Sequence, residues 1–79
     1  MTLKKLLVIT ESFTKIKIIE SKCRLWTRDI DLNKYLIEDA QECRTLFGDE
    51  KLQPYMNYKV IGLLSPNANT LTITIYKNN

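Results

Sequence analysis

The sequence predicts a small α+β domain in which one amphipathic helix packs on one face of a mainly antiparallel sheet. Three observations predict it: two β-rich segments come early, a stretch with helical spacing lies in the middle, and two further β-rich segments flank a turn-forming loop. The expected order is strand, strand, helix, strand, strand (β-β-α-β-β). A chain of 79 residues holds one modest core, so we expect a single domain over residues 1–79.

Two strands are expected first. Residues 3–10 are short, apolar and β-branched toward their end, which is typical of a buried strand. Residues 14–28 alternate with period two except at the doubled isoleucines, where a bulge would restore one consistent face. With that bulge, the residues that face the core are Ile16, Ile18, Ile19, Cys23 and Leu25.

The helix is expected from about Asp31 to Phe47. An amphipathic stripe with spacings of three and four supports it, formed by Leu32, Leu36, Ala40, Cys43 and Phe47, with Tyr35 beside them. Asp29 or Asp31 can cap its first amides, and Gly48 stands where a left-handed C-terminal cap is wanted.

Residues 55–64 and 70–77 are expected to form a hairpin around the loop 65–69. In the last run Leu71, Ile73 and Ile75 pack, while the threonines and Tyr76 face water. If this run lies at a sheet edge, residues 70–77 can pair across a two-fold axis, which predicts a route to a homodimer.

Charge is segregated along the chain, although the net charge is only +3. Residues 1–28 carry a net +5, residues 29–50 a net −5, and residues 51–79 a net +3. We therefore expect a basic sheet face opposite an acidic helix face, a field that steers anionic and cationic partners to different sides.

A basic row on the second strand is the candidate binding site. It consists of Lys15, Lys17, Lys22, Arg24, Trp26 and Arg28. Cations along a strand can track phosphates, and an exposed indole can stack on an unpaired base. The alternatives are that these cations only keep a strand soluble and that Trp26 turns into the core.

The predicted helix offers a second, acidic contact face through Glu38, Asp39 and Glu42. These carboxylates can meet a basic groove on a protein, or they can simply be solvated. No metal or cofactor is expected to bind them.

Several enzyme classes are excluded by composition. There is no His, so Ser-His-Asp and Cys-His nucleophile pairs and His-ligated zinc are absent. Two Cys without C-x-x-C spacing cannot make a four-thiolate zinc site or a typical redox motif, and we expect both to be free thiols. No secretory leader and no membrane-spanning run is recognisable, which favours the cytoplasm.

Residues 6–19 resemble the opening strand of the toprim domain of type IA topoisomerases and primases. The resemblance implies an acidic catalytic role for Glu11 and a magnesium-binding Asp-x-Asp at Asp29-Ile30-Asp31. The sequence departs from that family in reading as strand between Glu11 and Asp29, where the family has a helical crossover, and Asn33 stands in place of the third acid.

The prediction for function is a non-enzymatic binding protein that inhibits or modulates a host macromolecular machine by stoichiometric surface occupancy. Abundant Lys, Ile and Asn with scarce Ala and Gly indicate an AT-rich genome, such as that of a phage or mobile element. The partner is expected to be a host protein or nucleoprotein complex, not a membrane. Direct binding of RNA or single-stranded DNA by the basic row is the alternative. A metal-independent ribonuclease using Glu20, Arg24, Arg28 and Tyr76, or a toprim-like enzyme, is the distant one.

Overall fold

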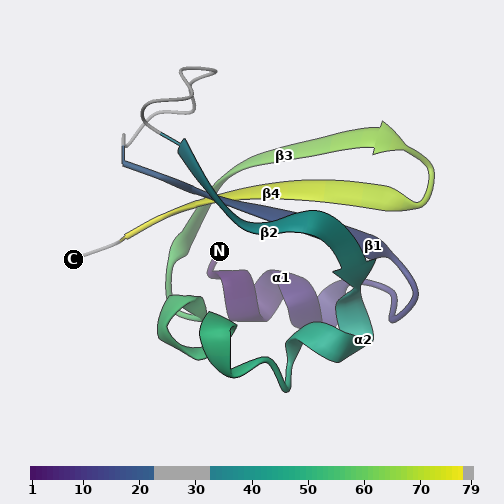
Figure 1. Ribbon diagram of the computed structural model, residues 1–79, viewed down its shortest axis with the longest axis horizontal. Coiled ribbons are helices and arrows are strands. Elements are labelled where there is room, and N and C mark those ends of the chain that lie inside the picture. Colours follow the sequence, from purple (N-terminus) through teal and green to yellow (C-terminus); the bar gives the residue numbers. More distant parts are fainter. Residues whose placement is uncertain (23–32, 78–79) are drawn as a thin grey trace.

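In the computed structural model, which describes residues 1–22 and 33–77, short helical segments lie on one face of a four-stranded mixed sheet (Figure 1). The α+β class predicted from the sequence is confirmed. Within the described residues the helical segments are α1 (Leu3–Ile9), α2 (Cys43–Leu46) and the 3-10 helix η2 (Glu50–Tyr55). None of the helices in this described part has the length and apolarity that crossing a bilayer requires.

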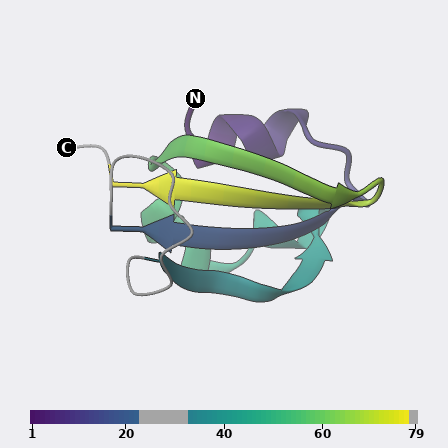
Figure 2. The same cartoon turned by 90° about the horizontal axis from the view of Figure 1, so that it is seen from above.

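The strands are β1 (Lys15–Ser21), β2 (Asn33–Glu42), β3 (Lys59–Asn67) and β4 (Thr70–Tyr76). They lie in the order β2-β1-β4-β3 (Figure 2). The two outer pairs are antiparallel, and the central pair β1–β4 is parallel. The sheet is therefore two antiparallel pairs joined side by side through their inner strands.

The core lies between the helices and one face of this sheet. The largest fully buried side chains are Leu3, Leu7, Ile16, Ile18, Leu46, Leu52, Ile73 and Ile75. They come from both central strands and from all the described helical segments. The helices are too short to be stable alone, so packing on the sheet holds them.

Residues 3–9 form a helix, so the prediction of a strand over 3–10 is wrong. Leu3, Leu6 and Leu7 are buried at spacings of three and one, which place them on one helical face. The Thr2 hydroxyl accepts a bond from the Lys5 amide at 3.3 Å and caps the first turn. The same apolar run therefore packs as an amphipathic helix, and Val8 is left exposed.

The prediction of a long helix over 31–47 is wrong for most of its length. Residues 33–42 form β2, and only Cys43–Leu46 is helical. Phe47 is exposed, and Gly48 does not adopt the left-handed conformation expected of a cap. Asp29 and Asp31 lie outside the described residues. Pairing with β1 overrides the helical spacing, as tertiary context often overrides local preference.

The hairpin near the C-terminus is confirmed, but its bounds differ: β3 begins at Lys59 and not at residue 55, and it reaches Asn67, so the loop before Thr70 is shorter than the expected 65–69. Ile73 and Ile75 are fully buried and Leu71 partly, as the alternation predicted. However, β4 is an inner strand with β1 on one side and β3 on the other. Residues 70–77 therefore do not form a free edge, so the condition set for a homodimer through them is not met.

Candidate functional site

The sheet face opposite the helices carries the first part of the basic row. Lys15 pairs in register with Thr70, and Lys17 with Thr72. Paired residues of neighbouring strands share a face, and the intervening Ile16 is buried in the core. Lys15, Lys17, Thr70 and Thr72 therefore lie on the face away from the helices, which we call the open face.

Three members of the basic row are described. Lys15 and Lys22 are exposed and Lys17 is half-buried. Arg24, Trp26 and Arg28 lie outside the described residues, so their orientation stays a prediction.

The expected inward set is confirmed for Ile16 and Ile18, which are fully buried. Ile19 is different: it pairs with Thr74 in an unbroken register against β4, so it points to the open face and is half-buried. The register shift at Ile18–Ile19 exists only in the pairing with β2. The expectation that a bulge would turn both isoleucines inward is wrong. Cys23 and Leu25 lie outside the described residues.

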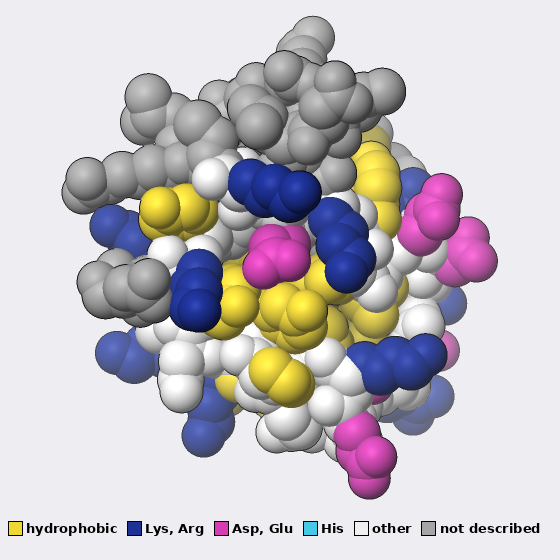
Figure 3. Space-filling model, turned by 60° about the vertical axis from the view of Figure 1, so that its left-hand side comes forward, with side chains coloured by type: hydrophobic (Ala, Val, Ile, Leu, Met, Phe, Trp, Pro, Cys, Tyr) yellow, Lys and Arg dark blue, Asp and Glu magenta, His cyan; other side chains and the backbone are white. Residues whose placement is uncertain are grey.

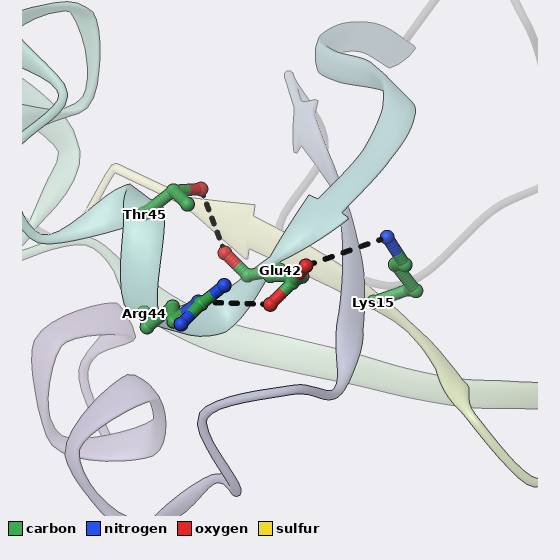
Figure 4. Close-up of polar contacts among 4 residues, drawn as sticks. All are labelled: Lys15, Glu42, Arg44 and Thr45. Carbon is green, nitrogen blue, oxygen red and sulfur yellow. Dashed lines mark hydrogen bonds and ion pairs between the residues drawn. The ribbon is translucent and has the colours of Figure 1, made fainter.

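A cross-strand ion pair connects Lys15 on the open face to the last residue of β2. Glu42, the last residue of β2, lies directly opposite Lys15, and Lys15 Nζ is 4.0 Å from its Oε1 (Figure 4). Arg44 Nε lies 2.9 Å from Oε2 of the same carboxylate, and that oxygen is buried. The Thr45 hydroxyl donates to the Glu42 carbonyl at 2.8 Å. Glu42 therefore joins the sheet to the start of α2.

The turn after α1 docks on the same corner. The Cys43 amide donates to the Thr14 carbonyl at 2.9 Å, and the Arg44 amide donates to the Ser12 carbonyl at 3.1 Å. The Arg44 guanidinium carbon lies 4.8 Å from the centre of the Phe13 ring, a cation–π contact. These contacts involve residues distant in sequence, so inspection of the sequence missed them.

Glu38 and Asp39 are exposed and lie on β2, not on a helix. From Ile16 to Ile18, β1 advances two residues while β2 advances four, from Gln41 to Ile37. The acids sit in this bulge, opposite Lys17. The acidic residues and the basic row are thus on neighbouring strands, and the expectation of an acidic helix face opposite a basic sheet face is wrong.

An aromatic residue that the sequence had placed beside the helix belongs to the open face. Tyr35 pairs with Ile19 and is 52% exposed. Tyr76 follows Ile75, which is buried in the core, so strand alternation directs it to the open face as well. Thr74 and Ser21 on this face are buried, so access is greatest toward Lys15 and Thr70.

Glu20 and Tyr76, both named for the ribonuclease alternative, project from opposite faces. Glu20 pairs with Ile75 and is therefore on the helix side. Partial burial raises the pKa of Tyr58 there, and the negative charge of Glu20 and the nearby Tyr55 raise it further. The rings of Tyr55 and Tyr58 meet edge-on, with their centroids 5.0 Å apart.

Figure 3, turned toward the left side of Figure 1, shows basic side chains around apolar and acidic ones.

The other sequence-derived sites find no support in the geometry. Residues 6–9, which resemble a toprim strand, are helical, and Glu11 is an exposed residue in the following turn. No three His, Cys, Asp or Glu residues converge on a metal-binding geometry within the described part of the chain. Cys43 is buried, burial raises the pKa of its thiol, and its Sγ donates to the Leu7 carbonyl at 3.4 Å. A protonated, enclosed thiol is unreactive.

Comparison of the chain with protein-family models, with curated proteins and with solved structures finds no match. The function proposed for this protein therefore depends on its own geometry.

Proposed function

We propose that this protein is a non-catalytic binding protein that occupies an anionic surface of a host macromolecular complex. The observation that carries the proposal is the asymmetry of the sheet. The described helices all cover one face, while the other presents Lys15 and Lys17 with the polar Thr70 and Thr72 (Figure 1). A sheet face with cations and hydroxyl groups suits docking on a negatively charged surface.

The charges of the open face favour long-range attraction of an anionic partner more than tight recognition of it after contact. Lys15 is already near Glu42 at 4.0 Å, and such an exposed pair is weak, so a partner's carboxylate or phosphate can replace it. The domain has a net charge of +3, which accelerates the encounter with an anionic partner. Binding of this kind is stoichiometric, because each molecule of this protein covers the surface of one partner complex.

The AT-rich residue usage supports a phage or mobile element as the source, and the proposed site of action is the host cytoplasm. The acids Glu38 and Asp39 lie at the border of the open face. In this proposal they repel the wrong part of an acidic partner and fix the orientation in which it docks.

The test is a charge reversal with a matched control. We expect the Lys15→Glu/Lys17→Glu variant to recover at least about tenfold less of the partner complex from a nuclease-treated low-GC bacterial lysate than the wild type does. The control, Lys5→Glu/Lys51→Glu, makes the same charge change on exposed lysines of α1 and η2 and should recover as much as the wild type. Equal losses in both variants would show that net charge, not the open face, determines binding.

A second candidate, binding of RNA or single-stranded DNA, is favoured by Tyr35. Its exposed ring lies on the same face as Lys17, and a base stacked on an aromatic ring contributes on the order of 1–3 kcal/mol. If this candidate holds, Tyr35→Ala weakens binding to an oligonucleotide strongly, and each lysine removed lowers the salt dependence of binding. If the protein complex is the target, recovery survives nuclease and Tyr35→Ala has a small effect.

A further inference from the structure

The free edge of β3 is the strongest unexplained feature of the sheet. β3 pairs with β4 on one side. On its other side, the only described pairing is at its beginning, where Thr2 bridges Lys59 and the Val60 amide donates to the Met1 carbonyl at 2.9 Å. From Ile61 to Ser65, before Pro66 removes an amide donor, the outer backbone groups have no strand partner among the described residues.

This segment, the β3 edge (Ile61–Ser65), lacks the charges that protect many exposed strands, and its residues 62–64 keep a regular register between two shifts, at Val60–Gly62 and at Leu64–Asn67. It contains no charged residue, and Leu63 and Leu64 are 55% and 58% exposed. Because the two leucines are adjacent in a strand, one lies on each face of the sheet. An uncharged edge with exposed leucines and unpaired amides is a template for another strand.

We propose that the β3 edge pairs antiparallel with the β3 edge of a second copy of this chain, across a two-fold axis perpendicular to the sheet. The result is one continuous sheet of eight strands, four from each copy. An axis of this orientation keeps the helices of both copies on the same side. Both open faces then lie together on the other side.

The segment is complementary to itself in this arrangement. With the axis at Leu63, each Leu63 lies opposite the partner's Leu63, and each Leu64 lies opposite the partner's Gly62, which has no side chain to oppose it. Within each pair, both residues lie on the same face of the sheet, because the register of residues 62–64 against β4 is unbroken. The Leu64–Gly62 pairs lie on one face, and the Leu63–Leu63 pair lies on the other.

Charge also favours the antiparallel orientation of the two copies. In an antiparallel pair the two Lys59 residues lie at opposite ends of the new ladder, so the only cations of β3 do not meet. A parallel pairing would bring them together, and like charges opposite one another are destabilising. The proposal does not rest on the proposed function, since it concerns another part of the sheet.

Sedimentation equilibrium from low-micromolar to near-millimolar concentration tests the proposal. We expect a reversible dimer for the wild type and a dissociation constant at least about tenfold weaker for Leu63→Lys, which sets two cations opposite each other. The control is Phe47→Lys, which adds the same charge at an exposed apolar residue directly after α2, on the side of β2 at the other edge of the sheet, and should leave the dimer intact.

Hydrogen exchange provides a second measurement that needs no variant. The amides of the β3 edge should exchange at least severalfold more slowly at high than at low protein concentration, while those of β2 should not change. A monomer at all concentrations would overturn the proposal, as would a dimer weakened equally by Leu63→Lys and Phe47→Lys. Capture of a foreign strand by a monomeric protein would identify the edge as a site for another partner and also overturn it.

Discussion

The two outer strands of the sheet, β2 and β3, differ in the charge that they carry along their outer edges. β2 carries Lys34, Glu38 and Asp39, and its bulge distorts the ladder where the acids lie. β3 has a neutral, apolar segment with leucines on both faces. β3 also has register shifts, on either side of residues 62–64, so the difference between the two edges is charge, which is a known means of preventing strand addition. The contrast indicates that one edge of this sheet is protected and the other is available.

Ile73→Ala gives the largest expected effect and tests whether the two edges belong to one cooperative unit. Ile73 is fully buried in β4, between β1 and β3, so truncation leaves a cavity and should lower the free energy of unfolding by about 2–5 kcal/mol. Chemical denaturation measures it, with Thr72→Ala on the opposite face as control. Separate unfolding transitions for the two halves would contradict the single sheet.

Glu38→Val/Asp39→Val is designed to remove the difference between the edges. Without the two carboxylates, the β2 edge should pair with the edge of another copy, and self-association should strengthen at least about tenfold. Light scattering against concentration measures it. Glu11→Val/Glu50→Val, which removes two carboxylates from exposed residues outside the sheet, is the control for lost charge. If the β2 variant behaves like this control, the bulge and not the charge protects β2.

Glu42→Gln has the smallest expected effect and refines the role of the acids on β2. Glu42 is paired with Arg44 at 2.9 Å and Lys15 at 4.0 Å, but these partners are half exposed, so the loss should be at most about 1 kcal/mol. Glu38→Gln, whose side chain is more exposed, should cost less. Thermal unfolding of both variants shows whether Glu42 stabilises the fold while Glu38 does not.

Part of the hairpin and the outward positions of Lys15 and Lys17 could be predicted because alternation is a local pattern. Ile73 and Ile75 inward, and Lys15 and Lys17 outward, follow from period two alone. The helix α1 was also readable, since Thr2 followed by Leu3, Leu6 and Leu7 is a capped amphipathic turn, but the apolar run suggested a strand.

β2 could not be predicted in this way. Leu36 and Ala40 fit a helical stripe, and only pairing with β1, which continues across two register shifts, makes the segment a strand. The Glu42–Arg44 pair and the docking of Ser12 and Thr14 on α2 depend on contacts between distant residues. Such contacts exist only after the chain has folded, so no local sequence pattern predicts them.

The parallel pairing at the centre of the sheet constrains the order of folding. Residues 15–20 of β1 each pair with a residue of β4 that lies 55 positions later, as Lys15 does with Thr70. A loop of that length must close before the pair can form, which slows folding. During synthesis β1 and β2 can form a hairpin early, but the inner edge of β1 waits for β4. A ribosome-bound chain lacking β4 would thus expose a second, temporary edge for other strands or for a chaperone.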